Sequence, residues 1–277
     1  MAETAELDVA PDTIEATLNY IVDDGTKVFT IVASPGGSDT RSGGTPDPRR
    51  VVIHNGRPHT NDFALDRNGF RFVRHDTKVA DFFDEAEIKR VYYPEMEALI
   101  KAESGAKRVV VFDHTLRTAD DELRESKKIR EVVRRVHNDY TEWSAPQRVR
   151  DIVPDEAEDL LKRRFAIIQV WRATNTPIER NPLAIVDARS IAPEDVIAAE
   201  RRFPHRVGEI YMFQYNPDHR WTYFPHMRRD EALVFKVYDS AKDGRARWGA
   251  HTSFEHPDTR ADAPPRESIE IRAFAFF

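Results

Sequence analysis

Two residues near the middle of the chain could bind one metal ion together. His137 and Asp139 are separated only by Asn138. Residues two apart on a β-strand point to the same face, so an imidazole and a carboxylate at this spacing can reach the same ion. A set of two histidines and one carboxylate leaves ligand positions open and is typical of non-haem Fe(II) oxygenases. The tripeptide alone is a weak signal, because the chain has ten histidines and 48 acidic residues.

A second pair, close to the C-terminus, suggests where a cosubstrate would bind. Arg266 and Ser268 alternate along a predicted strand and therefore share one face. In oxygenases that use 2-oxoglutarate, the distal histidine ligand is followed by an arginine, one further residue and a serine. The far carboxylate of 2-oxoglutarate requires a bidentate cation and a hydroxyl donor. The pair therefore predicts a 2-oxoglutarate site.

Two histidines could complete the metal site. His251 and His256 lie fifteen and ten residues before Arg266. The segment before His251 is typical of a strand, whereas His256 stands beside Pro257 in a segment typical of a turn. We expect His251 to be the third ligand, with His256 as the alternative.

The composition excludes several other classes of site and partner. The 277 residues include no cysteine, so thiolate nucleophiles, disulfides, zinc-thiolate sites and iron–sulfur clusters are excluded. The net charge of −6 argues against a nucleic-acid partner. Apolar runs are far shorter than the roughly 20 residues of a membrane span, and the N-terminal residues do not resemble a secretion signal. We expect a cytoplasmic protein without a membrane partner, either monomeric or homodimeric.

The elements that must position these residues are mostly strands. Alternating or β-branched runs predict strands at 17–22, 27–33, 50–54, 70–73, 108–113, 165–171, 208–214, 221–224, 232–238 and 267–274. Helices are expected over 84–104, with an interruption at Pro94, and over 154–164 and 192–203. A flexible loop rich in Gly, Pro and Ser is expected at about 34–48. The expected fold is mainly β with flanking helices, a double-stranded β-helix (jelly roll, cupin-like) core in one domain over 1–277.

Distinctive blocks of sequence extend over about four-fifths of the chain. They are Phe63–Phe70, Val91–Glu95, Val111–Thr115, Val136–Thr141, Val170–Arg172, Pro182–Ala184, His219–Pro225, Tyr238–Ser240 and Pro265–Glu270. In these blocks the chain resembles the AsaB-like hydroxylase/desaturase family, which includes gibberellin desaturase-type and CmcJ-type oxygenases. The resemblance implies an enzyme of secondary metabolism that uses Fe(II), 2-oxoglutarate and O2. It also implies hydroxylation, desaturation or ring formation on a small substrate, of secondary-metabolite or amino-acid type.

Six further side chains are weaker candidates, because each could equally serve packing or solvation. Arg172 and Tyr238 could bind a carboxylate of the cosubstrate, and Arg172 also hints at a substrate that carries a carboxylate. Substrate contacts could come from a strand-end histidine and from aromatic side chains, namely His114, Trp171, Tyr223 and Phe224.

Two other functions are compatible with the same metal ligands. One is a catalytically inactive cupin-like protein that binds a small molecule. The other is a divalent-metal hydrolase that activates water on the His/Asp/His set. A hydrolase has no need of a carboxylate clamp, so Arg266 and Ser268 favour the oxygenase.

Overall fold

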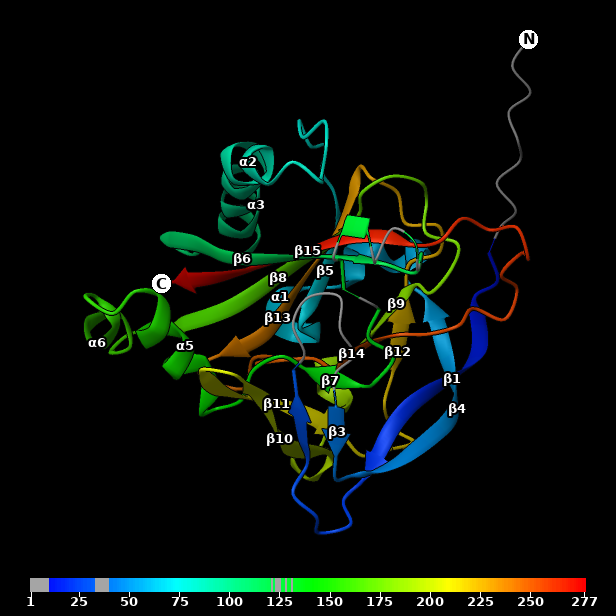
Figure 1. Cartoon of the computed structure of the whole chain (residues 1–277), viewed down its shortest axis with the longest axis horizontal. Helices are drawn as coiled ribbons and strands as arrows, with labels where there is room; N and C mark the ends of the chain where they lie inside the picture. The colour runs from blue at the N-terminus through cyan, green and yellow to red at the C-terminus, as the bar shows by residue number, and fades with distance from the viewer. Residues whose placement is uncertain (1–9, 33–39, 121, 123–125, 128, 131) are drawn as a thin grey trace.

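Two β-sheets form the core of the protein. The computed structural model describes residues 10–32, 40–120, 122, 126–127, 129–130 and 132–277, and Figure 1 shows the arrangement of the elements in these ranges. The larger sheet has ten strands. In spatial order they are β1 (Thr13–Val22), β4 (Thr45–Asn55), β12 (Trp221–Tyr223), β9 (Leu183–Val186), β14 (His251–Ser253), β7 (His137–Asn138), β11 (Arg206–Phe213), β10 (Val196–Phe203), β2 (Phe29–Ile31) and β3 (Thr40–Ser42).

The smaller sheet has five strands, all antiparallel to their neighbours. Their spatial order is β5 (Phe70–Arg74), β13 (Glu231–Asp239), β8 (Phe165–Ala173), β15 (Glu267–Phe276) and β6 (Arg108–Thr118). Side chains of β8 and β13 pack with Leu183 and Ile185 of the larger sheet in one apolar cluster. The two sheets therefore enclose a shared core, and the predicted mainly β, jelly-roll class is confirmed.

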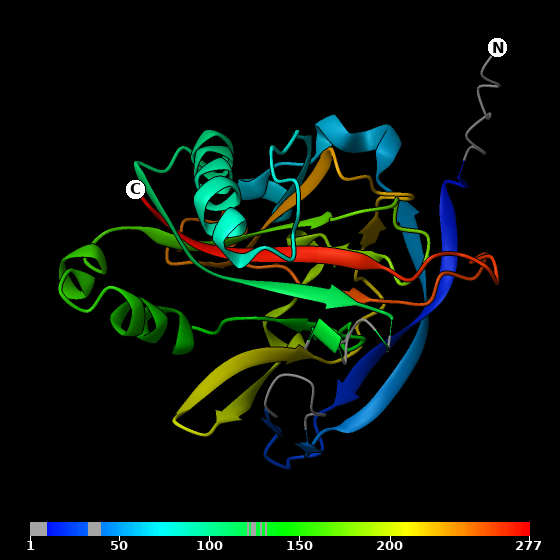
Figure 2. The ribbon, with the colours of Figure 1, turned by 45° about the horizontal axis from the view of Figure 1, so that its top comes forward.

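Helix α3 (Tyr93–Ser104) and Leu65 of α1 (Leu65–Asn68) pack on the other side of the smaller sheet, and α2 (Glu85–Glu87) precedes α3. Helices α5 (Ser144–Ile152) and α6 (Ala157–Leu160) instead pack in the apolar cluster that the two sheets share. Figure 2 shows α3 lying over β6 and β15. A π-helical turn at Ile88–Tyr92 joins α2 to α3 just before Pro94, which confirms the expected interruption of this helical region. No helix among the described residues is long and apolar enough to span a membrane.

Strand β8 shows how the two faces of the smaller sheet are used. All nine of its residues are buried. Phe165, Ile167 and Trp171 belong to the cluster shared with the larger sheet, whereas Ala166, Ile168 and Val170 belong to the cluster formed with α3. Adjacent residues of a strand point to opposite faces. A strand buried on both faces therefore separates neighbouring side chains into two environments.

Two expectations about elements were wrong. Residues 192–203 are not helical: a 3-10 turn at Pro193–Asp195 is followed by strand β10. The Pro-Glu-Asp start resembled a helix N-terminus, but eight residues of β10 pair antiparallel with β11, and this long-range pairing outweighs local helix propensity. The helix expected over 154–164 is limited to α6 and flanking turns.

The loop expected at 34–48 is also shorter than predicted. Residues 33–39 lie outside the described ranges, and the rest of the segment forms β3 and the start of β4. Gly43 and Gly44 connect these strands with positive φ angles of 73° and 69°, a conformation that glycine adopts without steric cost. Pro46 and Pro48 alternate in β4, so their missing N–H groups fall on one side of the strand, as expected where only the other side is paired.

Candidate metal centre

Strand pairing brings the two histidines of the candidate site together. In the larger sheet β7 and β14 are neighbours, and His137 lies directly opposite His251 in their antiparallel register. The centroids of the two imidazole rings are 4.3 Å apart. Asp139 follows β7 and lies on the same side as His137. The ligand atoms of His137, Asp139 and His251 all lie within 4.8 Å of one another, and the three side chains are buried.

The carboxylate of Asp139 is held by the smaller sheet. Its Oδ2 accepts hydrogen bonds from Gln169 Nε2 of β8 at 2.6 Å and from Arg272 Nε of β15 at 2.9 Å. Its Oδ1 lies 3.4 Å from His137 Nε2. Burial raises the pKa of Asp139, but the charge of Arg272 and the contact with His137 outweigh burial and hold the pKa well below 3.8. The carboxyl is therefore an anion with one oxygen directed into the triad.

Both imidazoles can offer a ring nitrogen to a metal ion. His137 Nδ1 lies 2.7 Å from the carbonyl oxygen of Arg135, to which it donates its proton, so that Nε2 is left as a lone-pair donor. Burial, and then the proximity of His137, lower the pKa of His251 well below 6.5. The buried Nδ1 of His251 has no hydrogen-bond partner among the described residues. Two histidines and one carboxylate fit a divalent ion such as Fe(II).

A buried guanidinium lies on the same side of the core as the triad. Arg266 precedes β15, and its side chain is buried with 3% exposure. The Nε atom donates to Ser268 Oγ at 3.1 Å, and Nη1 donates to the Ser253 hydroxyl at 3.1 Å and to the Asn181 carbonyl at 2.7 Å. Ser253 belongs to β14, two residues after His251, so Arg266 and the triad share one side of the core.

The guanidinium of Arg266 has no anionic partner among the described residues. None of their carboxylates lies within ion-pair distance, although a charge in the interior is costly unless it is paired. Burial, followed by the positive charge of Arg117, lowers the pKa of Arg266 to about 9. The indole ring of Trp171 lies 5.3 Å from the guanidinium carbon. A carboxylate ligand would supply the missing charge.

Known proteins match nearly the whole chain. The family model described as an oxidoreductase/YMDC permease-like domain matches residues 18–276. The hydroxylase/desaturase efuI of Hormonema carpetanum is 32% identical over 97% of both chains, and the hydroxylase/desaturase asaB of Aspergillus flavus is 30% identical over 95% of both. The chain belongs to the AsaB-like hydroxylase/desaturase family.

The activity class of this family member follows from the same comparisons. The Fe(II)/2-oxoglutarate-dependent dioxygenase nvfI of Aspergillus novofumigatus is 32% identical over 92% of this chain and 93% of its own length. The solved structure of the iron and alpha-ketoglutarate-dependent endoperoxidase NvfI matches with a TM-score of 0.86 and 29% identity, covering 96% and 98% of the two chains. The chain is an Fe(II)/2-oxoglutarate-dependent dioxygenase that uses O2, and neither the inactive binding protein nor the hydrolase is supported.

His256, the alternative candidate for the third ligand, lies outside the triad. His256 Nε2 lies 3.2 Å from the hydroxyl of Tyr223, and its Nδ1 accepts from the backbone N–H of Asp258 at 3.2 Å. Both ring nitrogens of His256 are therefore engaged in a turn outside the triad. Tyr223 packs against Phe254 and His256, not at the metal centre.

Four other predicted residues are not brought to the triad. Arg172 points from β8 to the helical side, where it contacts the carbonyl oxygens of His75 and Arg229, because its neighbour Trp171 occupies the inner side. His114 lies 2.9 Å from the Tyr93 hydroxyl and 3.0 Å from Glu85, and it is also among the residues that line a cavity beside Asp139. The Tyr238 hydroxyl donates to Glu142, and Phe224 stacks on Phe72 at 4.1 Å between ring centroids.

These placements correct two expectations in particular. Arg172 and Tyr238 were expected to bind the cosubstrate, but hydrogen bonds to other parts of the fold engage the guanidinium of Arg172 and the hydroxyl of Tyr238. Of the six weaker candidates, only Trp171 lies beside Arg266.

Sequence reasoning missed two residues that hold the centre together. Gln169 and Arg272 both contact Asp139. A signal for Arg272 existed, because Arg266, Ser268, Glu270 and Arg272 alternate along one strand and therefore share a face. Gln169 is a polar residue within an otherwise apolar strand, and a buried polar side chain requires a partner.

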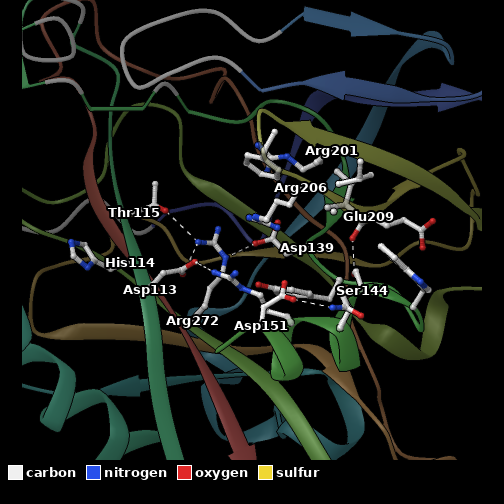
Figure 3. A pocket seen from close by; sticks show the side chains of 18 of the residues that line it. Asp113, His114, Thr115, Asp139, Ser144, Asp151, Arg201, Arg206, Glu209 and Arg272 are labelled. Carbon is white, nitrogen blue, oxygen red and sulfur yellow. Dashed lines mark hydrogen bonds and ion pairs between the residues drawn. The ribbon is translucent and has the colours of Figure 1, made fainter. Parts of the chain in front are cut away.

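An open cavity of about 270 Å³ leads to the carboxylate of the centre. It is lined by β6, by the segment from Asp139 through α5, and by the β10–β11 hairpin. Figure 3 shows Asp139 and Arg272 among its lining side chains, together with Arg201 and Arg206 of the hairpin. The cavity therefore leaves space next to Asp139 of the triad.

Proposed function

We propose that His137, Asp139 and His251 hold Fe(II), and that Arg266 and Ser268 hold the far carboxylate of 2-oxoglutarate. The observation that carries this assignment is the position of Arg266, a buried guanidinium without an anionic partner among the described residues, on the same side of the core as the triad. A small-molecule substrate enters through the cavity beside Asp139.

The bound iron and 2-oxoglutarate supply activation of O2 for oxidation of a substrate C–H bond, with succinate and CO2 as coproducts. The chain's own residues orient this site. The Arg135 carbonyl fixes the tautomer of His137, and Gln169 and Arg272 hold one oxygen of Asp139 so that the other faces the triad. Phe235 packs against the ring of His251 at 5.0 Å between centroids and excludes water from that side.

Arg266 is preorganised for its proposed role. Three hydrogen bonds from Nε and Nη1 fix the guanidinium, and Nη2 has no described partner and is available to a ligand. The Ser268 hydroxyl accepts from Arg266 and can donate its own proton to the same ligand. A planar cation and a hydroxyl donor side by side match a carboxylate.

The assignment is tested by anaerobic titration with Fe(II) and 2-oxoglutarate. Wild-type protein is expected to develop the weak visible charge-transfer band of an iron–2-oxoglutarate chelate. Arg266→Gln is expected to raise the Kd of 2-oxoglutarate by about 10- to 100-fold, the effect of one or two charge-assisted hydrogen bonds, with Fe(II) affinity nearly unchanged. Arg260→Gln is the matched control, because Arg260 is exposed and pairs with Glu179. An unchanged Kd in Arg266→Gln would remove Arg266 from the cosubstrate site.

A further inference from the structure

Two residues other than glycine have a positive φ angle among the residues that the structure describes. They are Asn181, at 52°, and His226, at 47°. This left-handed conformation is uncommon for a residue with a side chain, although asparagine tolerates it better than most. Pro182 follows Asn181, and a residue before proline normally adopts an extended conformation. Residues held in such a conformation persist only where the surrounding structure requires it, and they cluster at active sites and ligand sites.

Both residues direct a backbone carbonyl at an arginine. The His226 carbonyl accepts a hydrogen bond from Arg57 Nη2 at 3.1 Å. The Asn181 carbonyl accepts from Arg266 Nη1 at 2.7 Å. Arg57 also donates to both carboxylate oxygens of Glu231, at 2.8 and 2.9 Å, whereas Arg266 has no anionic partner among the described residues. A left-handed residue therefore orients a guanidinium in both places, and at Arg266 the place of the anion is left to a ligand.

The carbonyl of Asn181 is the centre of a small set of hydrogen bonds around this guanidinium. It accepts from the Ser253 hydroxyl at 3.0 Å as well as from Arg266 Nη1, and Ser253 Oγ in turn accepts from the same Nη1 at 3.1 Å. The third acceptor of Arg266 is Ser268 Oγ. These three oxygens are uncharged, so they fix the guanidinium without neutralising it. Its positive charge stays available to a carboxylate.

The side chain of Asn181 contributes less to this arrangement than its backbone. Asn181 is 4% exposed, and its Oδ1 is buried without a hydrogen-bond partner among the described residues, although a buried polar atom normally has one. Asparagine instead supplies tolerance of the left-handed conformation. That conformation sets the direction in which the carbonyl points, and so the direction from which Arg266 is held.

We propose that Asn181 is a positioning residue of the cosubstrate site, whose left-handed backbone directs its carbonyl at Arg266 and holds that guanidinium in place for the far carboxylate of 2-oxoglutarate. This inference rests on the proposed function, because it takes Arg266 as the group that binds the far carboxylate. Affinity for that carboxylate is therefore expected to depend on the backbone conformation of residue 181 rather than on its side chain.

The test compares 2-oxoglutarate with 2-oxopentanoate, which has the same metal-binding end and the same number of carbons but lacks the far carboxylate. The Kd of each acid is measured by anaerobic titration of the Fe(II)-loaded protein. Wild type is expected to bind 2-oxoglutarate at least about tenfold more tightly than 2-oxopentanoate. Asn181→Ala and Asn181→Ser are each expected to reduce this preference by about fivefold, because alanine and serine disfavour the left-handed conformation. The Kd of 2-oxopentanoate is expected to stay nearly unchanged.

Two variants separate the backbone conformation from the side chain and from strain in general. Asn181→Gly removes the same side chain as Asn181→Ala, but glycine adopts a positive φ without steric cost. It is expected to keep the wild-type preference within about twofold. His226→Ala is the matched control, because His226 has the same conformation and also directs its carbonyl at an arginine, outside the cosubstrate site. Its preference is expected to equal that of wild type.

Three outcomes would overturn the inference: an unchanged preference in both Asn181→Ala and Asn181→Ser, an equal loss in Asn181→Ala and Asn181→Gly, or a similar loss in His226→Ala. Failure of the proposed function is recognised with Arg266→Gln. If Arg266→Gln shows the wild-type preference, Arg266 does not bind the far carboxylate, and the assignment and the inference fail together. If Arg266→Gln loses the preference while Asn181→Ala and Asn181→Ser keep it, only the inference fails.

Discussion

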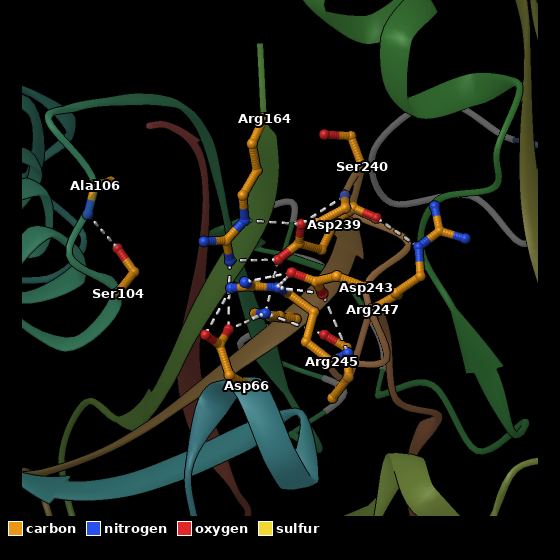
Figure 4. A network of polar contacts seen from close by, with 12 residues as sticks. Asp66, Ser104, Ala106, Arg164, Asp239, Ser240, Asp243, Arg245 and Arg247 are labelled. Atoms are coloured by element: carbon orange, nitrogen blue, oxygen red, sulfur yellow. Dashed lines mark hydrogen bonds and ion pairs between the residues drawn. The ribbon is translucent and has the colours of Figure 1, made fainter.

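Two regions of the smaller sheet that contain buried charges differ in whether those charges are paired. The first region surrounds Lys236 and Asp239 of β13, whose side chains are 1% and 0% exposed (Figure 4). Lys236 Nζ lies 2.7 Å from Asp239 and 2.5 Å from Asp66, and it donates to the Ala246 carbonyl at 3.0 Å. Arg164 completes the pairing of Asp239 at 2.7 Å.

Lys236, Asp239, Asp66 and Arg164 form a closed network, in which each buried charge has a partner of opposite sign. A local irregularity of β13 makes this network possible. Residues three apart on a regular strand point to opposite faces. The register between β13 and β8 shifts between Lys236 and Tyr238, and a bulge of this kind turns the following side chains. Lys236 and Asp239 can therefore meet, and together with Asp66 they join the strand to α1 and to the loop at Ala246.

The second region is the inner face of β15 with the triad opposite it, and it is left incomplete. Arg266 lacks a described anionic partner, His251 Nδ1 lacks a hydrogen bond, and Asp139 keeps one oxygen free of the protein donors that hold the other. Burying such groups without partners is costly. We therefore expect the network around Lys236 and Asp239 to stabilise the fold, and the incomplete region to be completed by ligands.

The largest expected effect is on the triad. Asp139→Ala and His137→Ala are each expected to reduce succinate formation by more than about 100-fold, because loss of an outer-sphere contact alone reduces metal affinity by about 10- to 100-fold. His256→Ala is the matched control and is expected to keep activity, since His256 pairs with Tyr223. Turnover is measured as succinate released, with circular dichroism to verify folding. Activity retained in Asp139→Ala would exclude Asp139 as a ligand.

Substitutions in the network around Lys236 and Asp239 are expected to change the stability of the fold rather than its metal affinity. Lys236→Met is expected to lower the free energy of unfolding by about 3 kcal/mol, because it leaves a buried carboxylate partly unpaired. Its Fe(II) affinity is expected to stay within about twofold of wild type. Urea unfolding measures the first quantity and metal titration the second. Lys242→Met, at an exposed ion pair with Glu142, should cost less than about 1 kcal/mol. Lost metal affinity with unchanged stability in Lys236→Met would reverse the comparison.

The residue pairs of the candidate site that are close together in sequence could be predicted from the sequence alone. His137 and Asp139, and Arg266 and Ser268, are pairs two apart, and alternation along a strand is enough to place each pair on one face. The choice between His251 and His256 depends on the register of β7 against β14, two strands more than a hundred residues apart in sequence. Local turn chemistry favoured His251, but no local signal specifies that register.

Other predictions were wrong where the local sequence pattern is compatible with two structures, such as either face of a buried strand or either a helix or a strand. Trp171 and Arg172 are adjacent in a strand that is buried on both faces, so no alternation of polar and apolar residues shows which one faces the triad. Residues 196–203 contain good helix formers, and only their pairing with β11 makes them a strand. Arg201, which lines the cavity, was therefore hidden in a segment predicted to be a helix.

A smaller effect is expected where an outer contact of the triad is removed. Gln169→Leu deletes the hydrogen bond to Asp139, whereas the amide oxygen of Gln169 has no partner to lose. Metal affinity, measured by Co(II) absorption, is expected to fall about tenfold. Gln214→Leu serves as control, because Gln214 donates to the Glu194 carbonyl outside the centre. Unchanged Co(II) affinity in Gln169→Leu would show that Arg272 alone positions the carboxylate.

The smallest effect concerns the pH dependence of the closed network. Burial raises the pKa of Asp239, but Arg164 and Lys236 outweigh burial and lower it below 3.8. A lowered carboxyl pKa contributes stability that is fully present above pH 3.8 and is lost as the pH falls through the folded-state value. The difference in unfolding free energy between wild type and Asp239→Asn should therefore be constant from pH 7 to about 5 and then shrink, by at most about 1.4 kcal/mol per pH unit. Asp139 titrates in both proteins and cancels in this difference. Urea unfolding at a series of pH values measures it, and a difference that grows on acidification would show that Asp239 is not stabilised as an anion.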